Sequence, residues 1–142
     1  MAQEFSLIAD PNPTIFKVVK ILSQAYTKGD ALMLDRTLDA VDVVPATSST
    51  ITSNIYAVAM ETVTSSATSL LVCLLTPDQT WTADASNTVL ATHNQFRMVL
   101  TDCTAVNNTT DSAAGVFQQT GSKPNGVSTR ILGRFLVGFS AA

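Results

Sequence analysis

The sequence predicts an all-β fold, mainly antiparallel, in which a single compact β-barrel or β-sandwich domain carries an extended N-terminal arm and little helix. Two observations support this prediction. Short apolar runs recur along the chain, and clusters of Gly, Pro, Asn, Asp, Ser and Thr separate them, as is typical of sandwiches and barrels. The length of 142 residues suits one domain, and no internal repeat or linker divides the chain.

Residues 1–15 are predicted to form the arm, and residues 16–142 the β domain. Pro11 and Pro13 favour extended geometry in the residues before them, and neither can donate to a strand ladder. A disordered tail is the alternative, but such tails are usually poor in apolar residues. We therefore expect the arm to lie across a neighbouring subunit. The candidate partner-binding residues share an apolar side chain in or beside the arm: Phe5, Leu7, Ile8, Ile15 and Phe16.

The β domain is predicted to begin with the apolar run 16–22, whose spacing also suits the start of a short helix. A turn at residues 26–30 leads to a second strand at 31–35, and a third strand at 41–44 ends at Pro45. The remaining predicted strands are 55–61, 70–75, 94–100, 115–119 and 129–139. The segment 83–92 has no clear pattern and is predicted to hold at most one helical turn. Hydroxyl-rich loops at 47–53 and 62–69 are further candidates for partner contact.

The composition indicates a surface that partners cover. Charged residues make up only 13% of the chain, about half of the usual ~25%, and the mean hydropathy is +0.25. Thr and Ser replace the missing charges, so neighbouring copies repel one another weakly. We therefore expect a homo-oligomer.

Several partner classes are not expected. A net charge of −3 and only eight basic residues argue against nucleic acid. The longest apolar run, 70–75, is far shorter than the roughly 20 residues of a membrane span, and residues 1–13 lack the features of a signal peptide. Cys73 and Cys103 each lie in a segment predicted to be buried strand, so we expect two free thiols.

The sequence offers no catalytic, cofactor-binding or metal-binding residues. His93 is the single histidine, and no G-x-S-x-G elbow accompanies it, so a surface-loop role is expected. Asp35, Asp39 and Asp42 lie close together but lack the spacing of a calcium loop, which favours a solvated hairpin end. We therefore predict a non-enzymatic structural protein without a cofactor or a small-molecule substrate.

The order of several segments resembles a known family. The run from Tyr26 to Asp35 is YTKGDALMLD, the run from Asp42 to Ser48 is DVVPATS, and YAVAME follows at 56–61. These runs are similar to the capsid decoration (cement) proteins of tailed bacteriophages, in which a Y-x-x-G-D opening precedes a V-P-A-T loop and a G-V-A strand ending in Glu. The chain has Ala57 where that glycine usually stands. The resemblance covers residues 20–137 loosely.

The resemblance implies a structural virion protein that binds the outer surface of an icosahedral phage head and stabilises contacts between capsomers. Its implied partners are the major capsid protein and further copies of itself, with a trimer favoured. The protein would be made in the host cytoplasm and reside on the capsid surface. The alternatives are another β-fold virion component, such as a head–tail connector, tail-tube or fibre subunit, or a carbohydrate-binding surface domain. The scarcity of aromatic residues (6% of the chain) argues against the last of these.

Overall fold

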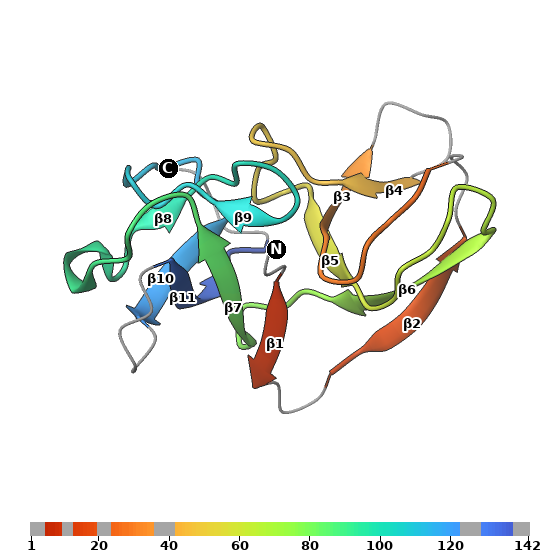
Figure 1. Cartoon of the computed structure of the whole chain (residues 1–142), viewed down its shortest axis with the longest axis horizontal. Coiled ribbons are helices and arrows are strands. Elements are labelled where there is room, and N and C mark those ends of the chain that lie inside the picture. The colour runs from red at the N-terminus through yellow and green to blue at the C-terminus, as the bar shows by residue number, and fades with distance from the viewer. Residues whose placement is uncertain (1–4, 10–12, 20–23, 36–41, 123–128, 138–142) are drawn as a thin grey trace.

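The computed structural model describes residues 5–9, 13–19, 24–35, 42–122 and 129–137. Within these ranges the chain forms eleven strands in two sheets, together with one turn of 3-10 helix at Ala91–His93 (Figure 1). The strand pairs are antiparallel except for one parallel pair. The described strands close no barrel, and one core takes residues from both sheets. The all-β prediction is confirmed, and the structure is the sandwich-like alternative.

The first sheet has the order β1-β7-β11-β10-β8, and β9 pairs with β7 in parallel. Its strands are β1 (Ser6–Ala9), β7 (Thr80–Ala85), β8 (Arg97–Met98), β9 (Ala105–Val106), β10 (Phe117–Ser122) and β11 (Arg130–Phe135). Successive side chains of β11 alternate between its two faces. Ile131 and Phe135 are completely buried, whereas Arg134 between them is only half-buried.

The second sheet has the order β2-β6-β5-β3-β4 and occupies the other half of the molecule in Figure 1. Its strands are β2 (Ile15–Val19), β3 (Ala31–Asp35), β4 (Asp42–Pro45), β5 (Ile55–Ala59) and β6 (Ser69–Leu74). Residues 15–19 pair with β6 over five positions, so the helical alternative for this segment is wrong. The β-branched residues Ile15, Val18 and Val19 favour the pleated surface of a strand.

The core between the sheets is aromatic on the side of the first sheet. The ring of Phe135 lies 5.0 Å from Phe5, 5.1 Å from Phe117 and 5.9 Å from Trp81, measured between ring centroids. Small aliphatic residues of the second sheet, such as Val58 and Cys73, belong to the same cluster. A large ring therefore meets a small side chain across the core, which allows close packing.

A second apolar cluster lies on the opposite face of the second sheet. Leu32, Ala57 and Val72 are completely buried there, although one chain neighbour of each belongs to the central core, namely Ala31, Val58 and Cys73. Tyr26 covers this face, where its hydroxyl donates a hydrogen bond to the Val43 carbonyl oxygen at 2.5 Å. Its backbone is bridged to Val63 by two hydrogen bonds of 3.1 and 2.9 Å.

The strand β7 was not recognised in the sequence. Its pattern is nevertheless the period-2 alternation of a half-buried strand, since Trp81, Ala83 and Ala85 face the core between polar neighbours. The segment 83–92 was predicted to hold at most one helical turn, and the 3-10 turn Ala91–His93 begins within that segment and ends one residue beyond it. Of the predicted strand 94–100, residues 97–98 form β8, and Leu100 makes an isolated bridge to Val106.

The segment assigned to the arm contributes to the first sheet of its own chain. Ser6 and Leu7 pair with Thr82 and Trp81 on β7, and Phe5 is only 3% exposed. The physical reason is the aromatic core, because the Phe5 ring fills space between Phe117 and Phe135 that would otherwise be a void. The predicted Asp39 of the acidic hairpin end lies outside the described residues.

Candidate functional site

The described residues contain no cluster of three or more His, Cys, Asp or Glu side chains arranged to hold a metal ion. Among these residues there is also no helix of the length and apolarity that crossing a membrane requires. His93 belongs to the short 3-10 turn, and its ring stacks on Phe96 with centroids 4.9 Å apart. Its Nδ1 atom is buried and has no hydrogen-bond partner among the described residues, so the geometry gives His93 a packing role.

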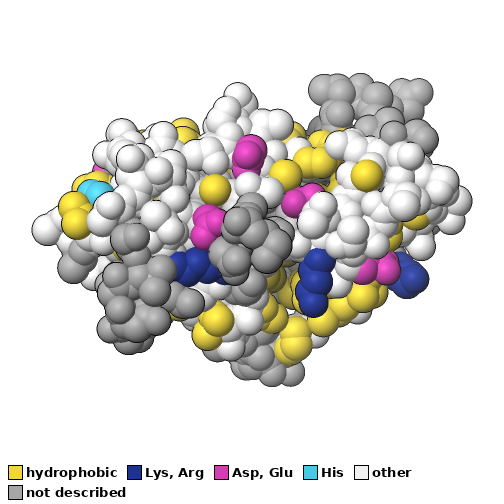
Figure 2. All heavy atoms as spheres, in the orientation of Figure 1, with side chains coloured by type: hydrophobic (Ala, Val, Ile, Leu, Met, Phe, Trp, Pro, Cys, Tyr) yellow, Lys and Arg dark blue, Asp and Glu magenta, His cyan; other side chains and the backbone are white. Residues whose placement is uncertain are grey.

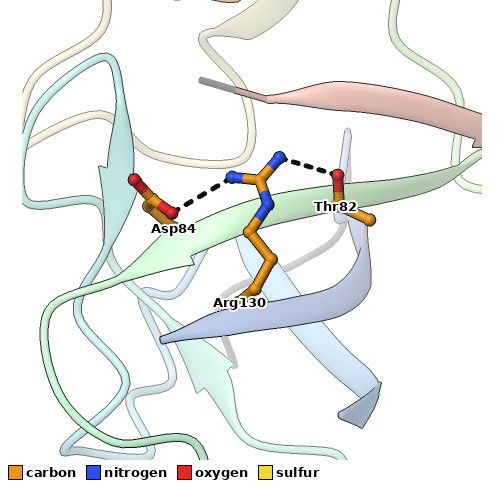
Figure 3. Close-up of polar contacts among 3 residues, drawn as sticks. All are labelled: Thr82, Asp84 and Arg130. Carbon is orange, nitrogen blue, oxygen red and sulfur yellow. Dashed lines mark hydrogen bonds and ion pairs between the residues drawn. The ribbon is translucent and has the colours of Figure 1, made fainter. Parts of the chain in front are cut away.

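The one ion pair among the described residues is structural (Figure 3). Arg130 on β11 lies opposite Asp84 on β7, and its guanidinium is 3.2 Å from the Asp84 carboxylate. The same group donates to the Thr82 hydroxyl at 2.8 Å. Since Arg130 is only 7% exposed, the two oxygens replace the water that its charge loses on burial. The pair joins two central strands on the outer face of the first sheet.

Neither Cys73 nor Cys103 forms a disulfide, and neither thiol is poised for nucleophilic chemistry. Cys73 is completely buried. Burial, together with the nearby carboxylates of Asp30 and Asp102, raises the pKa of the Cys103 thiol to about 12. Because only a thiolate attacks efficiently, a thiol that stays protonated at neutral pH is inert.

The structure divides the predicted partner-binding residues into two groups. Phe5 is buried in the core of its own chain, and Leu7 and Phe16 pack partly against the two apolar clusters. In contrast, Ile8 is 58% exposed and Ile15 is 47% exposed. Both exposed residues lie on edge strands, β1 and β2. Ile8 and Ile15 are therefore the members of the predicted set that an approaching partner can reach.

The two hydroxyl-rich loops predicted to contact a partner contain both exposed residues and residues whose hydroxyls are bonded within the loop. In the loop 47–53, Ser48 and Ser49 are exposed, whereas Thr50 is 2% exposed and its hydroxyl accepts the Thr47 N–H. In the loop 62–69, most residues are exposed, and the hydroxyls of Thr64 and Ser66 lie 2.9 Å apart. Part of the Thr and Ser content thus rigidifies the loops, and the rest faces solvent.

Tertiary structure creates one concave site that the sequence did not predict. A pocket of about 430 Å³ opens where β1, the turn before β3, the end of β5 and β7 meet. Leu7 comes from β1, Phe5 directly precedes that strand, Trp81 comes from β7, and Met60 follows β5. We call this site the junction pocket. Phe5 and Leu7 were predicted to contact a partner as part of an arm, and in the structure they line this pocket.

Hydrogen bonds between backbone groups hold the walls of the junction pocket in place. The Phe5 N–H donates to the Gly29 carbonyl oxygen at 3.1 Å, and the Gly29 N–H donates to the Ala59 carbonyl oxygen at 2.8 Å. Gly29 has a φ of 95°, a conformation that favours glycine. The Asp30 carboxylate accepts the Thr27 N–H at 2.9 Å and fixes the same turn. The Tyr26–Asp30 motif therefore shapes the pocket, a role that could not be found without knowing that β1 packs beside it.

Hydrophobic side chains also gather on the surface around β1, β2 and β6. Figure 2 shows them over the lower part of the face, where charged side chains are few and scattered. The exposed Ile8 and Ile15 belong to β1 and β2, and the partly buried Phe16 and Val18 pack on the outer cluster of the second sheet. Isolated exposed apolar residues are ordinary, but a contiguous group is typical of an interaction surface.

No protein-family model matches the chain, and no curated protein matches it.

Proposed function

We propose that this chain is a non-enzymatic structural virion protein, a capsid decoration (cement) protein. It binds the outer surface of an icosahedral phage head and stabilises the contacts between capsomers. Its partners are the major capsid protein and further copies of itself, with a trimer as the favoured oligomer. It is made in the host cytoplasm and resides on the virion surface.

The observation that carries this proposal is a surface short of charge and supplied with contact groups. Only 13% of the residues are charged, and the exposed large apolar side chains among the described residues are Ile8, Ile15, Ile51 and Leu90. A protein present in many copies on one lattice benefits from weak mutual repulsion. Contacts through Ser, Thr and short aliphatic side chains also cost little side-chain entropy.

The fold suits this role because it presents edge strands and exposed, hydroxyl-rich loops to a partner. The resemblance of the Tyr26–Asp35 and Asp42–Ser48 runs to decoration proteins supports the same function. Each contact with the shell is modest, but an oligomer that attaches at several points gains avidity from all of them.

Binding to a shell tests the proposal directly. The purified protein is mixed with shells assembled from the major capsid protein encoded in the same genome, and the shells are pelleted. We expect saturable co-sedimentation and, without shells, a small oligomer by light scattering. A clean monomer at micromolar concentration that leaves the pellet empty contradicts the proposal. Rings or stacked polymers indicate a tail-tube subunit instead.

A further inference from the structure

We propose that the junction pocket receives a peptide segment of the partner in which an aromatic or long aliphatic side chain stands next to a carboxylate. The inference rests on the proposed function only for the identity of the partner, which would be the capsid surface. The pocket itself follows from the fold.

The walls of the pocket select an apolar side chain. Leu7 and Met60 are partly exposed apolar residues that line the pocket, and the deeply buried Phe5 and Trp81 contribute small parts of its surface. The volume of about 430 Å³ falls within the roughly 300–1,000 Å³ that is typical of ligand sites. The thioether of Met60 adapts its shape to different occupants and packs well against aromatic rings.

The mouth of the pocket selects a negative charge. Lys28 lines the pocket, is exposed and makes no ion pair with the described residues. The acidic residues nearest to it in the turn and after β5 are engaged elsewhere. The carboxylate of Asp30 accepts the Thr27 N–H, and that of Glu61 accepts the Leu71 N–H at 2.7 Å. The ammonium of Lys28 is thus the charge that the pocket offers to a ligand.

Polar groups beside Lys28 can also bind the carboxylate of the ligand. Thr27 and Thr62 also line the pocket, and both are exposed. The Thr62 hydroxyl accepts the Lys28 N–H at 3.0 Å, which fixes the backbone of Lys28 and leaves its side chain free to reach the ligand. A carboxylate at the mouth can therefore accept hydrogen bonds from both an ammonium and a hydroxyl.

The pocket is preorganised for binding. The hydrogen bonds from Phe5 to Gly29 and from Gly29 to Ala59 join the first sheet to the second at this point. Because the walls are already ordered, the occupant bears most of the entropy lost on binding. A single peptide is expected to bind with a dissociation constant of roughly 1 mM. Several copies on a shell would bind much more tightly.

A titration with two peptides tests the inference. The probes are acetyl-Ser-Phe-Asp-Ser-amide and its neutral analogue, acetyl-Ser-Phe-Asn-Ser-amide. Binding is followed by nuclear magnetic resonance through the Trp81 indole N–H and the Gly29 amide. We expect saturable shifts of both signals, with the acidic peptide binding about three times more tightly at low salt.

Variants at two lysines give the control. In Lys28→Gln, the preference for the acidic peptide is expected to disappear while the Trp81 shift remains. Lys17→Gln removes an equally exposed lysine from β2, which contributes nothing to the pocket, and should keep the preference. Absence of a Trp81 shift with either peptide, or a preference that survives in Lys28→Gln, overturns the inference.

Shell binding separates this inference from the proposed function. If the peptides bind but the protein fails to co-sediment with shells, the pocket is correct and the proposed function is wrong. If Lys28→Gln binds shells as strongly as the unmodified protein, the proposed function stands and this inference fails. If Lys28→Gln instead dissociates the oligomer and the peptides do not bind, a second copy occupies the pocket, which also overturns the inference.

Discussion

The first sheet carries the aromatic core on one face and mainly polar residues on the other, whereas the second sheet has buried apolar residues on both faces. On β7, Trp81 and Ala83 face the core, and the residues between and after them, Thr82 and Asp84, join Arg130 on the outer face. On β5 of the second sheet, Val58 belongs to the central core and its neighbour Ala57 belongs to the outer cluster. Antiparallel sheets usually show the first arrangement.

The difference shows that the second sheet depends on what covers its outer face. Tyr26 and Val63 cover part of it, and Phe16, Val18 and Tyr56 at its margin remain only partly buried. The first sheet instead obtains its stability from close packing around the Phe135 ring. We therefore expect substitutions that enlarge a side chain to destabilise the first sheet, and substitutions that shorten a buried side chain to destabilise the second.

Adding one methyl group to the first sheet should have the largest effect. A Cβ atom at Gly133 would lie 2.3 Å from the Phe117 ring and 2.5 Å from the Gln118 carbonyl oxygen. Because the backbone oxygen cannot move aside, Gly133→Ala is expected to lower the free energy of unfolding by about 3 kcal/mol. Urea denaturation followed by Trp81 fluorescence measures the loss.

Gly121→Ala is the matched control for that substitution. Both glycines lie in the β10–β11 pair, but a Cβ at Gly121 meets only the Leu132 side chain at 3.9 Å, an ordinary contact. We expect a change within about 1 kcal/mol of the unmodified protein. Equal losses for the two variants would show that close approach at Gly133 is not what limits this sheet.

Removing volume from the outer cluster of the second sheet should have the next largest effect. Leu70 is completely buried there. Leu70→Ala is expected to lower the free energy of unfolding by about 2 kcal/mol, because it leaves a cavity within the outer cluster. Circular dichroism and Trp81 fluorescence should report one common transition. If circular dichroism falls while Trp81 fluorescence stays native, the second sheet unfolds alone, and the two sheets are separate cooperative units.

At neutral pH the smallest effect is expected at the seam between the sheets, where the Ala31 N–H donates to the Cys103 carbonyl oxygen at 2.7 Å. Folding raises the pKa of the Cys103 thiol from 9.0 to about 12. The folded chain therefore holds this proton more tightly than the unfolded chain does. Stability should be independent of this thiol below pH 9 and should fall between pH 9 and 12, as the unfolded chain loses the proton first.

Comparison with Cys103→Ser isolates this contribution from other groups that titrate in alkali. The unmodified protein should lose stability more steeply than the variant over this pH range. At pH 8, a thiol reagent should leave the folded protein unmodified and react with two thiols in urea. Rapid labelling of Cys103 in the folded protein would mean that its thiol is more accessible than the structure indicates.

The sequence by itself determined the all-β class, the positions of most strands and the low surface charge. Strands such as Ile55–Ala59 and Ser69–Leu74 were predictable because their apolar residues and flanking turns are local features. Ile8 and Ile15 are exposed, and their binding to a partner stays a prediction.

Tertiary structure alone decided the rest. The sequence could not show that Phe5 completes an aromatic cluster, that Arg130 meets Asp84 46 residues away, or that Lys28 and Trp81 line one pocket. Residue patterns report which face of a strand is apolar, but not which distant strand or turn will cover that face. Those pairings depend on the packing of residues far apart in the chain, and here they set both the core and the candidate site.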